Sequence, residues 1–143
     1  MTDGWTILLI AIAGGVGAVV RYLVHARPGA RPRLAWSGPV PRPAKPGIWD
    51  SPHTRLFAVN VAASLITGFV SAFLAGPWGV ILVTGFCGGL STWSTLMNDA
   101  RLLLDDGRLG RGLGILALAL ACSIAAVLAG WQLAGLLAGL LAS

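Results

Sequence analysis

Acidic residues are scarce in this sequence, and their scarcity excludes several kinds of protein. The chain has no glutamate, and its five acidic residues are all aspartates, at positions 3, 50, 99, 105 and 106. We expect all of them at the ends of apolar segments or in loops. A proton-coupled multidrug transporter of four short helices needs a carboxylate at membrane depth, so that class is disfavoured. No nucleophile–base pair or metal-binding cluster is apparent, so an enzyme is not expected.

Charge of either sign is rare, and apolar residues dominate. Only 10% of the 143 residues are charged, 56% are hydrophobic, and the mean hydropathy is +0.81. This composition predicts an integral membrane protein with a single domain over residues 1–143. The two cysteines, Cys87 and Cys122, fall in apolar segments without a metal-binding spacing and are interpreted as small buried hydrophobes. Basic residues flank the apolar segments, so the high isoelectric point does not indicate a nucleic-acid partner.

Four apolar segments are long enough to cross a bilayer. They cover residues 5–24, 56–75, 78–97 and 113–142. These segments predict an all-α membrane protein with four transmembrane helices. Gly76 and Pro77 leave a very short connection, so the second and third helices should be antiparallel neighbours. Residues 26–54 hold seven of the eight prolines and are expected to form an extended loop.

Basic residues are confined to one side of the predicted membrane topology. All ten lie at or in the loops that follow the first and third helices, at 26–54 and 98–112. The termini and the Gly76 turn have none. The positive-inside rule therefore places both loops in the cytoplasm and both termini outside the cell membrane. Arg21 lies near the end of the first helix, where it either snorkels to the interface or attracts anions at a pore mouth.

The segment from Gly85 to Leu96 combines three glycines with four hydroxyl side chains inside the third span. Glycine weakens a helix by about 1 kcal/mol relative to alanine, so this composition predicts a break at Gly88–Ser91. Broken backbone at membrane depth must be buried or line a cavity, where its carbonyls can hold a cation and hydroxyls can donate to an anion. The alternative is an unbroken helix that packs through small residues.

Asn60 is the one amide inside the second span. Ser64 follows it by four residues and should share its face of the helix. Asn60 therefore either joins helices by hydrogen bonds or lines a polar path as a donor. Small residues recur at Gly14–Ala18, Gly85–Gly89 and Gly135–Gly139, which predicts close helix packing and an oligomer.

Three segments together resemble the Fluc/CrcB fluoride channels. They are Gly14–Tyr22, Val59–Ser64 and Gly85–Thr95, in that order along the chain. The resemblance implies passive export of fluoride across the cell membrane to relieve fluoride toxicity. It also implies an antiparallel dimer with two fluoride pathways and a structural sodium ion.

Site residues follow from the same resemblance, position by position. The backbone carbonyls of Gly88 and Ser91 would hold the sodium ion. Asn60 would line the fluoride pathway, with Ser94 and Thr95 as a hydroxyl track, and Arg21 would lie in the vestibule. The two pore phenylalanines of the family fall at Trp93 and Leu96 here. An aromatic ring edge can face an anion, so Trp93 can replace a phenylalanine, whereas Leu96 cannot.

The charge imbalance bears on the expected partner. An inverted homodimer needs each copy to insert in either orientation, which ten basic residues against none oppose. A heterodimer with a homologous subunit of opposite charge bias is therefore favoured, and an inverted homodimer is the alternative. The missing phenylalanines also suggest an alternative function, as a non-conducting or half-conducting assembly subunit of a heteromeric channel.

Overall fold

The computed structural model describes residues 4–25, 52–105 and 107–142, and every regular element in these ranges is a helix. The all-α prediction is therefore confirmed for the described part of the chain. The loop expected at 26–54 lies outside it at positions 26–51. In chain order the elements are α1 (Gly4–His25), α2 (Pro52–Phe73), α3 (Pro77–Val80), the π-helix η2 (Ile81–Cys87), α4 (Gly88–Leu90), α5 (Trp93–Asp105) and α6 (Leu109–Ala142).

Three stretches are long and apolar enough to cross a membrane: Gly4–Val24, Thr54–Phe73 and Leu109–Leu141. The third expected span, 78–97, is not one continuous helix. Its apolar part is the shorter stretch Pro77–Leu90, formed by α3, η2 and α4 in succession. At 1.5 Å per residue this stretch is about 21 Å long. The hydrocarbon core is roughly 30 Å thick, so this stretch is too short to cross it alone.

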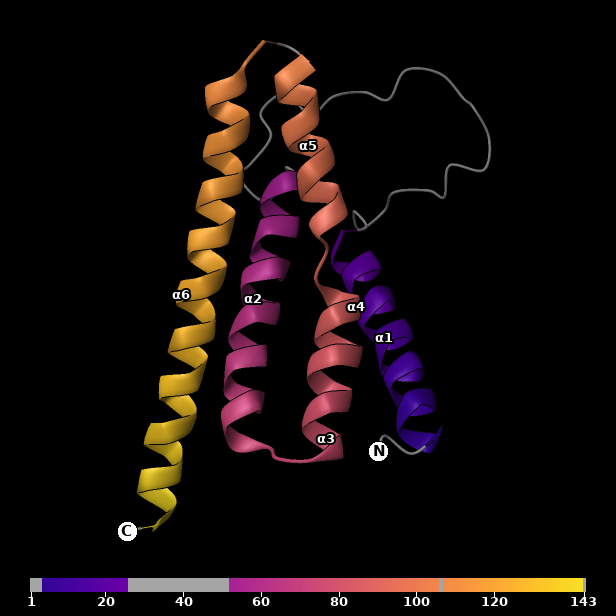
Figure 1. Cartoon of the computed structure of the whole chain (residues 1–143), viewed down its shortest axis with the longest axis vertical. Coiled ribbons are helices and arrows are strands. Elements are labelled where there is room, and N and C mark those ends of the chain that lie inside the picture. Colours follow the sequence, from indigo (N-terminus) through magenta and orange to yellow (C-terminus); the bar gives the residue numbers. More distant parts are fainter. Residues whose placement is uncertain (1–3, 26–51, 106, 143) are drawn as a thin grey trace.

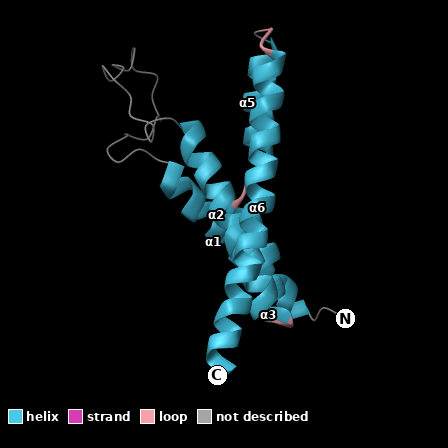
Figure 2. Cartoon of the chain, turned by 90° about the vertical axis from the view of Figure 1, so that its left-hand side faces the viewer, coloured by secondary structure: helices cyan, strands magenta, loops and turns pink. Residues whose placement is uncertain are grey.

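The helices form one layer in the order α6, α2, the α3–α4 stack and α1 (Figure 1). Turned by 90°, α5 and α6 run at an angle across α1 and α2 (Figure 2). The start of α1 and the end of α6 lie at the same end of the layer, and the α5–α6 connection lies at the other.

The turn between α2 and α3 is short, as the sequence predicts. Gly76 has φ 80°, a conformation that residues with a Cβ rarely adopt. Pro77 begins α3, where its missing N–H costs no helical hydrogen bond. Next to this turn, the Trp5 and Trp78 rings meet edge to face at 6.4 Å between centroids and link the start of α1 to α3.

The backbone of α1 packs directly on the backbone of the third span. A methyl group at Gly17 would overlap the carbonyl oxygen of Phe86 and lie 2.8 Å from the Leu90 nitrogen. A methyl group at Gly89 would likewise overlap the carbonyl oxygen of Gly14. The small-residue faces predicted for these two helices therefore meet. By contrast, Gly135 and Gly139 on α6 have no neighbour in the described subunit within 4 Å of such a methyl group.

A small apolar core lies between α2 and α4. It consists of Val59, Ala63 and Leu90, with Val20 and Phe86 packed against it. On its other side α2 packs on α6, where Gly68 and Gly130 allow the two backbones to come close. α2 is thus packed between two neighbours. These two contacts determine how the helix is rotated about its axis, and so where its polar residues lie.

Candidate functional site

The third span breaks at Ser91 and Thr92. Its last helical hydrogen bond runs from the Ser91 amide to the Cys87 carbonyl at 2.9 Å. Ser91 then turns to an extended conformation, with φ −74° and ψ 150°, and α5 begins at Trp93. Gly88, with φ −64° and ψ −38°, is still helical. The predicted break at Gly88–Ser91 was therefore wrong in its start, because the α-helix continues through Leu90 and Gly89 packs on Gly14.

The side chain of Asn60 on α2 is hydrogen-bonded to both residues of the break. Its Oδ1 accepts a hydrogen bond from the Thr92 backbone amide at 2.9 Å and another from the Ser91 hydroxyl at 3.2 Å. Its Nδ2 donates to the Thr92 carbonyl at 3.1 Å. The amide thus satisfies both backbone groups of Thr92 and uses three of its four hydrogen-bonding positions for the break. The structural alternative foreseen for Asn60 is present, and one Nδ2 hydrogen is left for a further partner.

These contacts also affect the last turn of α4. In a continuous helix the Thr92 amide would donate to the Gly88 carbonyl. In this chain that amide is engaged by Asn60. Gly88 is also exposed, and a methyl group there would meet only the Val83 carbonyl oxygen, at 3.9 Å. Gly88 is therefore not used for packing within the described subunit.

Hydroxyl groups surround the break on the α5 side. Thr92 is buried, and its Oγ1 lies 3.2 Å from the Oγ of Ser94, which is exposed. Sequence reasoning assigned no role to Thr92, although it is the second of the four hydroxyl residues in this run. The side chain of Thr95, the other half of the predicted hydroxyl track, lies outside the described part of the structure.

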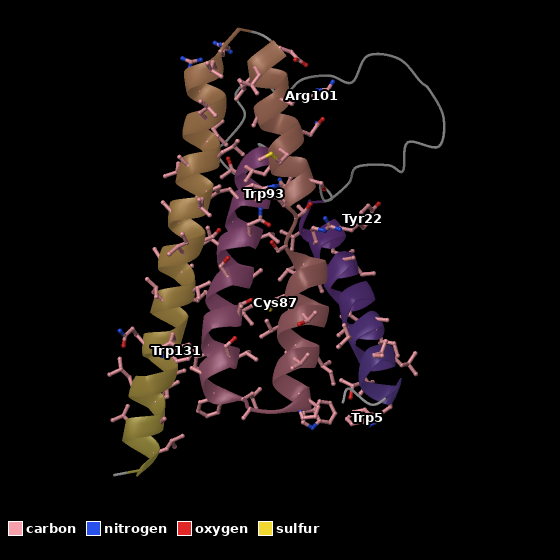
Figure 3. The ribbon with its side chains drawn as sticks, viewed as in Figure 1. Trp5, Tyr22, Cys87, Trp93, Arg101 and Trp131 are labelled. Carbon is pink, nitrogen blue, oxygen red and sulfur yellow. The ribbon has the colours of Figure 1, made fainter. Side chains whose placement is uncertain are left out.

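Aromatic and basic residues flank the same region. Trp93 is 56% exposed and lies close to the break, level with the upper part of α2 (Figure 3). Leu96 follows on α5 and is half-buried. Arg21 lies one turn before the end of α1 and is also half-buried.

Metal chemistry at this site would have to use backbone or hydroxyl oxygens. Within the described ranges, no three His, Cys, Asp or Glu side chains gather at one place. The oxygens at the break are those of carbonyls, hydroxyls and one amide, all of them uncharged. Such a set suits a hard monovalent cation, whereas Zn²⁺ favours nitrogen and sulfur ligands. The same hydroxyls and the amide N–H suit an anion that accepts hydrogen bonds.

Comparison with known proteins gives a consistent result. The family profile described as "CrcB-like protein, Camphor Resistance (CrcB)" matches residues 8–131. Three relatives named "Fluoride-specific ion channel FluC" are similar over most of their length. The one from Ignicoccus hospitalis is 35% identical over 78% of this chain and 87% of its own. The one from Bacteroides fragilis is 34% identical over 89% and 94%, and that from Nitrobacter winogradskyi 32% over 90% and 95%. This chain is a multi-pass membrane protein that belongs to the CrcB-like family.

Proposed function

We propose that this chain is a subunit of a fluoride-specific ion channel that lets fluoride leave the cell passively. The observation that carries the proposal is the break at Ser91–Thr92, where uncharged hydrogen-bond donors gather in the family's matched region. The relatives named above are ion channels and not enzymes, and they align with most of this chain. Because they are named as channels themselves, the alternative of a non-conducting assembly subunit is not favoured.

The chemistry of the break suits fluoride. Fluoride is small and strongly hydrated, so a selective pore must replace its water shell with many donors. The remaining Nδ2 hydrogen of Asn60 and the hydroxyls of Ser94 and Thr95 are such donors, and the edge of the Trp93 ring adds positive partial charge. None of these groups is charged, so none traps the ion. Arg21 concentrates anions at the vestibule without entering the path.

We also propose a structural sodium ion at the carbonyls of Gly88 and Ser91. Support comes from the exposed Gly88 backbone and from the engagement of the Thr92 amide by Asn60. Two carbonyls are too few for a sodium ion, which needs several oxygen ligands. A second subunit in antiparallel orientation would supply the same pair again and complete the site. The four passes in each subunit, with α3–α4 and α5 together forming the third, belong to the same proposal.

The orientation in the membrane follows from the ten basic residues. We propose that they keep residues 26–54 and the connection between α5 and α6 in the cytoplasm and both termini outside. The loop expected at 98–112 is shorter than predicted, because α5 extends to Asp105 and α6 begins at Leu109. The same bias opposes insertion of an inverted copy. The antiparallel partner is therefore a homologous subunit of opposite charge bias, and the inverted homodimer is the alternative.

Fluoride efflux from liposomes tests the function. The chain is reconstituted alone and with a homologous subunit, and fluoride and chloride are followed with ion-selective electrodes. We expect fluoride efflux with little chloride efflux and no dependence on a proton gradient. Chloride efflux as fast as that of fluoride would refute a fluoride-specific channel. Fluoride flux driven by a proton gradient would refute passive permeation.

A further inference from the structure

α2 has a line of polar side chains that runs from the break toward the opposite end of the helix. Asn60, Ser64, Thr67 and Ser71 are spaced by four, three and four residues. At 3.6 residues per turn they lie within an arc of about 60° and extend along roughly 16 Å of the helix axis. We call this set the α2 polar line. It covers about half the thickness of a hydrocarbon core of roughly 30 Å.

The line is separate from the faces that α2 uses for packing. On one side of it, Val59 and Ala63 pack against Leu90. On the other side, Gly68 lies against Val127 of α6. The residues of the line fall between these two faces on the helix, where Asn60, Ser64 and Thr67 are half-buried and Ser71 is exposed. Close packing within the subunit therefore does not account for their polarity.

The apolar side of α2 is elsewhere. Leu65 and Ile66 are 39% and 37% exposed and lie away from the polar line. α2 thus has a lipid-compatible side and a polar side. The long helix α6 differs, because Ser123 and Gln132 are the only hydroxyl or amide side chains in Leu109–Ala142. The hydroxyls at membrane depth are thus concentrated on α2 and at the break.

The line begins at the candidate site itself. Asn60 is hydrogen-bonded to Ser91 and Thr92, and Ser71 lies two residues before the end of α2 at Phe73. From the break to that end, successive side chains of the line are about one helical turn, or roughly 5 Å, apart. An anion that leaves the break would therefore pass from one hydrogen-bond donor to the next.

We propose that the α2 polar line is the part of the fluoride path that joins the break to the end of the membrane where α2 meets α3. This inference rests on the function proposed above and extends it to residues without an assigned role: Ser64, Thr67 and Ser71. Their hydroxyls donate in turn to the ion as it moves. The competing explanation is that these hydroxyls bond only to their own helix backbone, in which case their loss leaves the flux unchanged.

Paired variants of Thr67 test the proposal in reconstituted full-length protein. Thr67→Val keeps the shape of the side chain and removes the hydroxyl, whereas Thr67→Ser keeps the hydroxyl. A hydrogen bond to a charged group is strong, so we expect fluoride efflux to fall at least about tenfold in Thr67→Val. We expect Thr67→Ser to stay within about threefold of the parent. The matched control is Thr6→Val, the same change at a buried threonine of α1, which should leave the flux unchanged.

A double variant, Ser64→Ala with Ser71→Ala, probes the rest of the line and should also lower the flux. Parent-like flux in both Thr67→Val and the double variant would overturn the proposal while the channel function stands. Equal loss in Thr67→Val and Thr67→Ser would overturn it too, because the flux would then fall whether or not the hydroxyl is kept. A parent protein without fluoride flux, both alone and with a homologous subunit, would instead refute the proposed function. Size-exclusion profiles are compared for all variants, and a variant whose flux falls only because it fails to assemble also counts against the path.

Discussion

Oδ1 of Asn60 lies 2.9 Å from the backbone nitrogen of Thr92, in the position that a carbonyl oxygen would occupy if the helix continued. A side chain of α2 thus provides the hydrogen-bond acceptor that a backbone carbonyl of the third span would otherwise provide. Asn60 also accepts from Ser91 and donates to the Thr92 carbonyl, so the break is stabilised from a neighbouring helix. The side-chain amide that is proposed to contact the ion therefore also stabilises the conformation of the break.

Replacement of Asn60 should affect both stability and flux. Asn60→Ala removes three hydrogen bonds between α2 and the break, which should cost roughly 3 kcal/mol of unfolding free energy. Fluoride efflux should fall at least about tenfold, since a half-buried donor is lost as well. Thermal unfolding in detergent and liposome efflux measure the two effects. Gln132→Ala, which removes an exposed amide on α6, is the control and should change neither. Unchanged efflux in a destabilised Asn60→Ala protein would limit Asn60 to a structural role.

The contact of α1 with the third span should tolerate no added side chain at Gly17. Gly17→Ala places a methyl group against the Phe86 carbonyl and the Leu90 amide, so the helices must separate. Overpacking of this kind costs about 1–3 kcal/mol. Gly15→Ala is the matched control on the same helix, because a methyl group at Gly15 meets nothing within 4 Å in the described subunit. Melting temperatures of the two variants are compared, and equal values would contradict the close approach of the backbones.

Substitutions at Gly88 and Gly89 test two different contacts, one between subunits and one within the subunit. A side chain at Gly88 has space within the described subunit, whereas one at Gly89 overlaps Gly14. We therefore expect Gly89→Ala to impair folding. Gly88→Val should fold but weaken the dimer about tenfold or more, which corresponds to at least 1.4 kcal/mol. Dimer dissociation on dilution, with and without sodium, is the measurement. A Gly88→Val dimer as stable as the parent and still sodium-dependent would count against the proposed sodium site.

Trp93 should require an aromatic ring but not an indole. The ring edge has positive partial charge, which an aliphatic side chain lacks. We expect Trp93→Phe to keep fluoride efflux within about threefold and Trp93→Leu to lower it by about tenfold, a difference of the size of one aromatic interaction. Fluoride efflux from liposomes is the measurement. Trp131→Leu on α6 is the control, because Trp131 is equally exposed. Parent-like efflux in Trp93→Leu would remove Trp93 from the pathway.

The basic residues should fix one orientation in the membrane. Cysteines introduced at both termini are expected to react with a membrane-impermeant reagent added outside the cells. Each basic residue near an anionic leaflet contributes about 1 kcal/mol, so the basic residues that remain after Arg101, Arg108 and Arg111 are replaced by Gln should still fix this orientation. Labelling of the unmodified chain from both sides in similar amounts would show dual topology. The argument for a homologous partner of opposite charge bias would then fail.

Local sequence patterns predicted much of the fold. Apolar length located the helices, and the Gly76–Pro77 pair located the turn between α2 and α3. The small residues of α1 and the third span also meet as expected, because only glycine permits such close backbones. The third span is interrupted, as expected, but the interruption starts later than predicted, since the apolar stretch ends at Leu90 and the chain then turns at Ser91.

The position of the break depends on a distant contact and could not be predicted from the local run. Glycine propensity suggested that the helix ends at Gly88, but Gly89 is held in the helix by its packing on Gly14. The actual break forms where Asn60, 32 residues earlier, can bind the Thr92 backbone. The hydroxyl run itself marked the right region, and it contained Thr92, whose role appears only when α2 is placed beside it.

The separation of 32 residues between Asn60 and Thr92 has a consequence for the synthesis of the chain. The Pro77–Leu90 helix is too short to cross the bilayer by itself, and the amide that follows it finds its partner only on α2. α2 must therefore still lie beside the insertion machinery when Ser91 and Thr92 emerge. The two helices then enter the membrane as one hairpin, about the turn at Gly76. Ribosome-bound chains that stop at Leu90 should remain open to protease, and those that extend through α5 should be protected.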